Sequence, residues 1–287
     1  MATILDTLKK GAEYFQRHQI DEARLNMELL LAHVLKIDRM RLYLDFDRPL
    51  SETQLSALRE LTIRRGKGEP LQHLLGSVEF CDLEFLTDAR ALVPRPETEE
   101  LTHLLLARTW PSSPRLLDLG CGSGVIGISL AHHLRAQLPS VVLSDLSADA
   151  LSLARENATR LLPIESAPRL VEGDLFEKLA GESFDLIAAN LPYIPDSAET
   201  ALSREVRRDP ALALFGGTNG TEVMERFLAA APDHLTSGGV LAMEFGIDQA
   251  PLLQRRAEEM GFDSVEIRKD LGGIERFLFA VKTAEGG

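Results

Sequence analysis

The residues best suited to chemistry in this 287-residue sequence are four consecutive ones: Asn190, Leu191, Pro192 and Tyr193. They follow an apolar run over residues 184–189, which is typical of a buried strand. Polar residues that end such a strand lie at the mouth of a sheet, where α/β proteins usually bind their ligands. The four residues therefore predict a site that holds a planar NH2 group.

An amide or aromatic amine is a poor nucleophile because its lone pair is delocalised into the adjacent π system. Two acceptors aimed at its two N–H groups would orient the lone pair and stabilise the positive charge that grows on nitrogen. Asn190 can supply a side-chain oxygen and Leu191 a backbone carbonyl, which Pro192 turns outwards by holding Leu191 extended. Tyr193 can lie against the planar group. We predict methyl transfer to a planar nitrogen, with Asn190 and Tyr193 as catalytic residues.

A cofactor loop is predicted directly after the first strand of the sheet, and it consists of Gly120, Cys121, Gly122, Ser123 and Gly124. Glycines allow the backbone to turn sharply and to approach a ligand closely. Asp145 ends the next strand, where a carboxylate can accept hydrogen bonds from both hydroxyls of a ribose. Asp174 and Leu175 follow the third strand, where the edge and the face of an adenine would lie. Together with Asn190, these residues form the predicted cofactor site.

Two cofactor classes contain such a ribose. Gly122, Gly124 and Gly127 satisfy the dinucleotide pattern G-x-G-x-x-G, so a nicotinamide-dependent dehydrogenase is one alternative. Methyl donation from S-adenosylmethionine requires only a sulfonium held in line with the nucleophile, and no separate acid, base or metal. We therefore favour S-adenosylmethionine, with S-adenosylhomocysteine as the product. A binding module without enzymatic activity, which would consume no methyl donor, is a third possibility.

Apolar residues at helical spacing predict helices in the first part of the chain. Apolar residues recur with helical period over 4–15, and a second helix is predicted over 25–35 with Asp21 as its cap. Ser51 and Gln54 fit a capping box for a further helix. We predict a helical substrate-docking or packing domain at 1–72, a β-hairpin linker at 73–92 and a methyltransferase domain at 93–287.

The rest of the chain alternates strands with helices, which predicts an α/β fold with a parallel sheet covered on both faces. Gly272 and Gly273 join the last two strands, which should form an antiparallel pair at one edge. The strands are predicted at 116–119, 141–144, 169–171, 184–189, 240–245, 264–267 and 276–281, and the helices at 125–138, 148–161, 221–235 and 249–260.

The charge and composition of the chain limit which partners, compartment and metal sites can be expected. The formal net charge of −13 would repel nucleic acid, and it lies on residues 76–287, because residues 1–75 hold 12 basic and 11 acidic residues. The cluster of Arg64, Arg65 and Lys67 is interpreted as a solvated helix end. No apolar run reaches the ~20 residues of a membrane span, and there is no leader, so we expect a cytoplasmic protein. Cys81 and Cys121 predict neither disulfides nor a metal site.

Over nearly its whole length the chain resembles the bacterial PrmC/HemK family of protein-(glutamine-N5) methyltransferases. The resemblance implies a Rossmann-like class I methyltransferase fold with a seven-stranded sheet. It also implies transfer of a methyl group from S-adenosylmethionine to the side-chain amide of the glutamine in the Gly-Gly-Gln loop of peptide chain release factors. We expect such a chain to act as a monomer. The motifs that carry the resemblance are Gly68-Glu69-Pro70, Gly76, Phe80, Pro94-Arg95-Pro96-Glu97-Thr98-Glu99, Gly120–Gly124, Asn190–Tyr193, Glu205-Val206-Arg207, Pro210, Gly216-Gly217, Glu244 and Gly246.

One position departs from the family. Leu191 stands where the family has a proline, which removes a restriction on Asn190 but keeps the backbone carbonyl. Asn-Leu-Pro-Tyr also resembles the ribosomal-RNA adenine dimethyltransferases, so an N6-adenine methyltransferase acting on RNA or DNA is the alternative function. The negative charge and the helical domain in front of the sheet speak against that alternative.

Overall fold

The computed structural model describes residues 2–282, and these form two compact units. One unit contains the segment up to Ser77 together with Leu202–Arg208, and the other contains Val78–Ala201 and the chain from Asp209 onward. The three-part division at 72/73 and 92/93 stays a prediction. Within residues 2–282, no helix combines the length and the apolar character needed to cross a bilayer.

The first unit is helical, as predicted. Its apolar core includes Phe15, Leu30 and Leu58, which are almost fully buried. The helices are α1 (Ile4–Arg17), α2 (Ala23–Leu35), α3 (Arg39–Leu44), α4 (Glu52–Gly66) and α5 (Leu71–Leu75).

Two predictions about helix ends had different outcomes. The capping box of α4 is confirmed, because Gln54 N donates to Ser51 Oγ at 3.3 Å and Ser51 N donates to Gln54 Oε1 at 2.9 Å. The prediction of Asp21 as the cap of α2 is wrong. Glu22 precedes the helix with φ 48° and provides no side-chain cap, while the Asn26 side chain donates back to the carbonyl of Asp21 at 3.1 Å.

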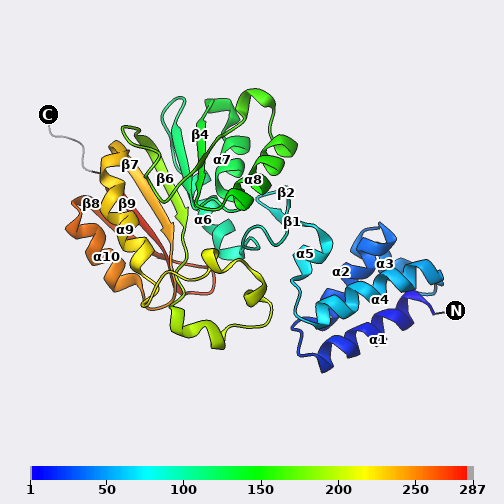
Figure 1. The fold of residues 1–287 in the computed structure, drawn as a ribbon. Coiled ribbons are helices and arrows are strands. Elements are labelled where there is room, and N and C mark those ends of the chain that lie inside the picture. The colour runs from blue at the N-terminus through cyan, green and yellow to red at the C-terminus, as the bar shows by residue number, and fades with distance from the viewer. Residues whose placement is uncertain (1, 283–287) are drawn as a thin grey trace. The chain divides into compact units, whose positions relative to one another are not determined.

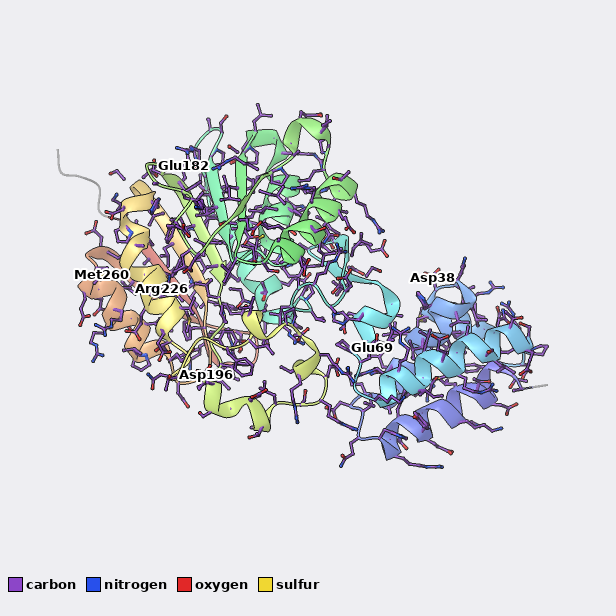
Figure 2. The ribbon with its side chains drawn as sticks, viewed as in Figure 1. Asp38, Glu69, Glu182, Asp196, Arg226 and Met260 are labelled. Carbon is purple, nitrogen blue, oxygen red and sulfur yellow. The ribbon has the colours of Figure 1, made fainter. Side chains whose placement is uncertain are left out.

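The interpretation of the basic cluster as a solvated helix end is wrong for Arg65. This side chain is buried, and its guanidinium donates to Asn26 Oδ1 at 2.7 Å, to the Glu69 carbonyl at 3.0 Å and to Glu205 Oε2 at 2.7 Å. Glu205 lies on the segment 202–208, so this ion pair fastens that segment to the helices of the first unit. Arg64 instead forms a half-exposed ion pair with Glu69. Figure 2 labels Glu69.

The second unit is built on a seven-stranded sheet with the order β5-β4-β3-β6-β7-β9-β8. All neighbours up to β7 are parallel, and β9 pairs antiparallel with β7 and β8, as predicted for the edge. The strands are β3 (Arg115–Leu119), β4 (Ser140–Asp145), β5 (Arg169–Glu172), β6 (Phe184–Asn190), β7 (Leu235–Glu244), β8 (Phe262–Lys269) and β9 (Glu275–Lys282).

Helices cover both faces of this sheet (Figure 1). Alternate residues of each central strand enter different cores: Leu116 packs with α6 (Pro96–Leu106), α7 (Val125–His133) and α8 (Ala148–Leu161), whereas Leu117 packs with α9 (Glu222–Ala230) and α10 (Ala250–Glu259). The helix predicted over 125–138 ends earlier because a 3-10 turn follows it at Arg135–Gln137.

The strand register brings three sequence-distant ends together. Leu119 of β3 lies beside Ser144 of β4 and beside Ala189 of β6, so the residues that follow each strand meet at one edge. The chain runs from β3 outward to β4 and β5 and then returns to the other side of β3 as β6. Ligands of open α/β sheets bind at such a reversal of strand order.

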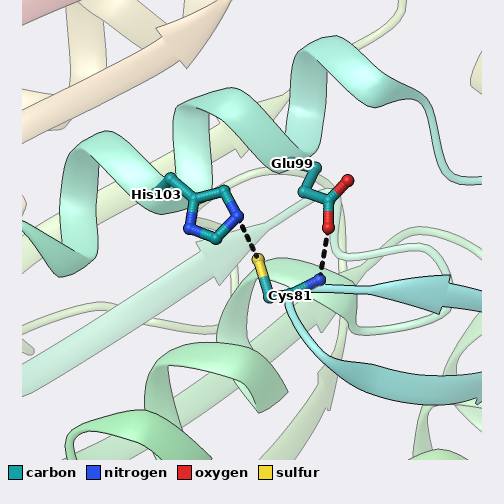
Figure 3. A group of neighbouring side chains, drawn as sticks. All are labelled: Cys81, Glu99 and His103. Atoms are coloured by element: carbon teal, nitrogen blue, oxygen red, sulfur yellow. Dashed lines mark hydrogen bonds between the residues drawn. The ribbon is translucent and has the colours of Figure 1, made fainter.

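A hairpin of β1 (Ser77–Phe80) and β2 (Leu83–Leu86) precedes the sheet, as predicted. Its turn residue Cys81 has φ 48°, and its N–H donates to Glu99 Oε1 at 2.6 Å while its carbonyl lies 2.8 Å from His133 Nε2. His103 Nε2 lies 4.0 Å from the thiol (Figure 3). Burial raises the pKa of Cys81 to about 12. The thiol is therefore protonated, and Glu99 serves to hold the hairpin against α6.

Candidate active site

A cavity of about 280 Å³ lies where the carboxyl ends of β3, β4 and β6 meet. All of its lining residues belong to the second unit. The cofactor loop, Asp145, Asp174, Leu175, Asn190, Leu191 and Pro192 all contribute to its wall, so the structure brings these predicted residues together. The remaining wall includes Asp118, Thr98, Arg95, Pro210 and Phe215.

The cofactor loop can form only with glycine at its turns. Gly120, Gly122 and Gly124 have φ values of 71°, 55° and 82°, a region that L side chains rarely adopt. The N–H of Gly120 donates to the carbonyl of Ser144 at 2.8 Å, which fixes the loop against β4. A Cβ atom added at Gly120 would lie 2.9 Å from Cδ2 of Leu191. The loop and the predicted acceptor site are thus in direct contact.

Two carboxylates lie beside this loop. Asp145 accepts the N–H of Gly122 and the N–H of Ser147, each at 2.8 Å, while burial raises its pKa. Asp118 accepts the N–H of Gly127 at 2.8 Å through Oδ2, and burial raises its pKa to about 7. Oδ1 of Asp118 has no hydrogen-bond partner among the described residues. Oδ1 of Asp118 and the remaining lone pairs of Asp145 are therefore available to polar groups of a ligand.

The other two members of the loop have structural surroundings. Burial raises the pKa of Cys121 well above its ordinary value, so this residue is a neutral thiol rather than a nucleophile. The carbonyl of Ser123 accepts from Asn157 Nδ2 at 3.0 Å, and the same Nδ2 atom donates to the carbonyl of Leu86 at 3.1 Å. Asn157 is fully buried in α8 and was missed by sequence reasoning, because one asparagine in a helix gives no signal.

Asp174 and Leu175 line the cavity on the side of β5. The Asp174 carboxylate accepts from Arg226 of α9 at 2.6 Å, and Figure 2 labels this arginine. Leu175 has φ 49°, so its backbone is held in the left-handed region. Their roles toward an adenine stay predictions.

Asn190 is held by two buried residues. Its Nδ2 lies 2.8 Å from Thr98 Oγ1, and Thr98 Oγ1 lies 2.7 Å from Glu244 Oε2. Glu244 ends β7 directly beside Asn190 of β6, and Thr98 stands in the first turn of α6. Sequence reasoning noted Thr98 and Glu244 only as parts of family motifs. The structure joins them to the predicted site.

The rest of the tetrapeptide divides between cavity and core. Leu191 is buried with its side chain against Gly120, and Pro192 lines the cavity. Tyr193 is not among the described residues of the cavity wall; it packs in the core on the side of α9 and α10, and burial raises its pKa to about 12. The predicted contact of Tyr193 with the planar group stays a prediction.

Close backbone packing fixes the course of the chain after Asn190. A Cβ atom at Gly216 would lie 2.4 Å from the carbonyl oxygen of Pro192, and one at Gly220 would lie 2.4 Å from that of Tyr193. The side chain of Gln249 adds a link, because Nε2 donates to the Tyr193 carbonyl at 2.9 Å and Oε1 accepts the N–H of Gly246 at 2.7 Å.

The doubled proline around Arg95 also has a structural explanation. Asp209 is buried, and its carboxylate accepts from Arg95 Nη2 at 2.5 Å and from the N–H of Val93 at 3.2 Å. Pro94 lines the cavity, and Pro96, the first residue of α6, favours the extended conformation of Arg95 before it. Sequence reasoning missed Asp209, since an aspartate before a proline is an ordinary turn signal.

Comparisons with known proteins agree with this geometry. The chain matches the family models described as PrmC N-terminal domain, over residues 6–76, and methyltransferase small domain, over 97–211. A release factor glutamine methyltransferase from Geobacter sulfurreducens is 40% identical over 278 residues, which cover 96% of this chain and 95% of that protein. A protein of the same name from Chlorobaculum tepidum is 39% identical and covers 96% of both chains. The chain belongs to the release factor glutamine methyltransferase family.

Solved structures support the fold of this family member. A methyltransferase from Pyrococcus furiosus superimposes with a TM-score of 0.53 at 20% identity, covering 70% of this chain and 89% of that one. A Thermus thermophilus 16S rRNA N2 G1207 methyltransferase, solved with AdoMet and guanosine, superimposes with a TM-score of 0.50 at 21% identity. The match covers 72% of this chain and 49% of that one. The predicted Rossmann-like class I fold is confirmed, and so is the prediction of a methyltransferase. The dehydrogenase and the non-enzymatic binding module are not supported.

Proposed function

We propose that this release factor glutamine methyltransferase transfers a methyl group from S-adenosylmethionine to the N5 side-chain amide nitrogen of the glutamine in the Gly-Gly-Gln loop of a peptide chain release factor. The observation that carries the proposal is the contact between the cofactor loop and the Asn190 tetrapeptide in one cavity. The full-length similarity to relatives named for this activity supports the protein substrate.

The residues present fit the methyl donor. S-adenosylmethionine supplies an activated methyl group on its sulfonium. Asp145 keeps lone pairs for the two ribose hydroxyls although each carboxylate oxygen already accepts one backbone N–H. Oδ1 of Asp118 is available to a polar group of the ligand. Gly122 leaves room beside the backbone, because a Cβ atom added there would lie 3.8 Å from Cβ of Ala91. Asp174 and Leu175 would hold the adenine at the β5 side of the cavity.

Asn190 and Leu191 would hold the acceptor. Asn190 turns its Nδ2 toward Thr98, which leaves Oδ1 to accept one N–H of the substrate amide, and the Leu191 carbonyl accepts the other. This pair of acceptors keeps the nitrogen lone pair directed at the donor and stabilises the charge that develops on nitrogen. Pro192 fixes Leu191, and Tyr193 would cover the face of the amide. The nitrogen loses its proton after transfer, so no basic side chain is required before it.

We further propose that the enzyme works as a monomer in the cytoplasm, where release factors act, and that nucleic acid is not its substrate. The deciding experiment offers radiolabelled S-adenosylmethionine together with an intact release factor, the same factor with its loop glutamine replaced, and ribosomal RNA. Label on the intact factor alone is the expected result. Label on RNA and on neither protein would contradict the proposal in favour of an adenine N6 enzyme.

A further inference from the structure

The contacts of Thr98 define a direction for the hydrogen bonds around Asn190. The Thr98 hydroxyl carries one proton, and an ionised carboxylate can only accept. Thr98 therefore donates to Glu244, at 2.7 Å, and must accept from Asn190, at 2.8 Å. Only Nδ2 of Asn190 can serve as that donor, so Oδ1 is the atom that remains for another partner. The orientation of the Asn190 amide follows from the charge of Glu244.

We propose that Thr98 and Glu244 are positioning residues, which orient the side-chain amide of Asn190 so that its Oδ1 accepts an N–H of the substrate amide. The inference rests on the proposed function. Neither residue reaches the reacting atoms in this scheme, since both act through Asn190. Their burial, at 4% and 1% exposure, removes water that could replace either partner.

Protonation of Glu244 would remove the constraint that fixes this direction. A neutral Glu244 donates its own proton to Thr98 Oγ1, and the Thr98 hydroxyl is then free to donate to Asn190. Asn190 would satisfy that donor by turning Oδ1 toward Thr98 and Nδ2 toward the substrate. An NH2 group cannot accept the N–H of another amide, so this form of the site cannot hold the substrate productively.

The surroundings of Glu244 raise its pKa, so that its protonation falls within the pH range of ordinary assays. Burial is the main cause that raises the pKa of Glu244 to about 7; the hydroxyl of Thr98 lowers it and the charge of Glu97 raises it. Arg276 on β9 and Arg95 before α6 also face this carboxyl and lower its pKa. Turnover should therefore rise with pH through about 7 as Glu244 ionises.

The test measures kcat and KM from pH 6 to pH 9 with the full chain, S-adenosylmethionine and an intact release factor. Thr98→Val should lower kcat at pH 8 by about 10-fold, as loss of a hydrogen bond in a charged network does, with KM for S-adenosylmethionine unchanged. Thr98→Ser should restore turnover. Thr102→Val is the matched control, because Thr102 is buried one turn later in α6 and its hydroxyl donates to a backbone carbonyl, that of Thr98, at 2.9 Å. Wild-type turnover in Thr98→Val would overturn the inference.

Glu244→Gln tests the direction itself, because a glutamine side chain cannot ionise. The rise in kcat near pH 7 should vanish in this variant. A rise that persists would assign the titration to another group, such as Asp118, and would overturn the role of Glu244.

A failure of the proposed function is recognised separately. If the wild-type enzyme transfers no label to the release factor, the orientation of Asn190 is read from its side-chain NH2 signals in 15N NMR spectra of the free protein. A shift of these signals in Thr98→Val then supports the inference, and unchanged signals overturn it.

Discussion

At the scale of single residues, the chemistry of this enzyme depends on where a few amide and carboxylate atoms point. Asn190 alone could present either its oxygen or its nitrogen to a substrate. In the proposed scheme Thr98 decides between them, because a hydroxyl that donates to Glu244 can only accept from the Nδ2 atom 2.8 Å away. The orientation proposed for Asn190 thus depends on the Thr98 side chain, which stands 92 residues earlier in the chain.

We expect Asn190→Ala to reduce turnover by at least ~100-fold, because one oriented contact that stabilises developing charge is typically worth that much. Affinity for S-adenosylmethionine should stay nearly unchanged, since Asp145, Asp174 and the glycine loop supply most of the proposed cofactor contacts and the main proposed role of Asn190 concerns the acceptor. Steady-state kinetics with a radiolabelled donor and calorimetry of donor binding check the two parts. Turnover close to wild type would remove Asn190 from the mechanism.

Asp145→Ala should weaken the affinity for S-adenosylmethionine. The substitution removes the proposed ribose acceptor and also releases the N–H groups of Gly122 and Ser147, which Asp145 holds at 2.8 Å each. Asp149→Ala is a matched control, because Asp149 is an exposed residue in the first turn of α8. Calorimetry compares the two variants, and equal affinities would defeat the assignment of Asp145.

At the scale of elements, the strands and helices place the tetrapeptide, and glycines allow it to fit. The chain after Asn190 runs against Gly216 and Gly220, whose missing side chains admit the carbonyls of Pro192 and Tyr193. Ile194 completes the contact, since its N–H donates to the Leu214 carbonyl at 2.9 Å and its carbonyl accepts from Gly216 at 3.0 Å. The backbone of residues 214–220 therefore supports the predicted acceptor site.

Gly216→Ala should lower turnover strongly, because the new Cβ atom would lie 2.4 Å from the Pro192 carbonyl oxygen and the backbone of one segment must move. Gly272→Ala is the control. Gly272 lies in the turn between β8 and β9, and the atom nearest to a Cβ added there is Oδ1 of Asp270, at 3.1 Å. Kinetics and thermal melting of both variants separate loss of activity from loss of fold. Full activity in Gly216→Ala would show that this packing does not position the site.

Elements with strong periodicity could be predicted from the sequence, and pairs that are distant in the chain could not. Short apolar runs between helical segments located the strands of the sheet to within about five residues, and Ser51 located the start of α4. The contact of Thr98 with Glu244 spans 146 residues and that of Arg95 with Asp209 spans 114. No local pattern encodes such pairs, because they arise only when the sheet has set its register.

At the scale of the whole molecule, stability should depend on pH through buried carboxyls. Burial raises the pKa of Asp118 from 3.8 to about 7, so the folded state holds a proton that the unfolded state has released. Stability from this group is complete below pH 3.8 and is lost as pH rises through about 7.

Asp118→Asn removes this dependence, since an asparagine does not titrate. Relative to wild type, the variant should therefore gain stability between pH 5 and pH 8. Thermal melting of the free protein at the two pH values provides the measurement. A constant difference between variant and wild type across that range would contradict a raised pKa at Asp118.

The helical unit needs the segment Leu202–Arg208, which is synthesised long after its helices. Arg65 is buried in the helical unit, yet its carboxylate partner Glu205 follows it by 140 residues. Domains generally fold as they leave the ribosome, starting from the N-terminus. Here the helices of the first unit emerge early, but their buried guanidinium stays without Glu205 until β3, β4, β5 and β6 have all been synthesised. The N-terminal unit of this enzyme is thus completed after most of its parallel sheet has been translated.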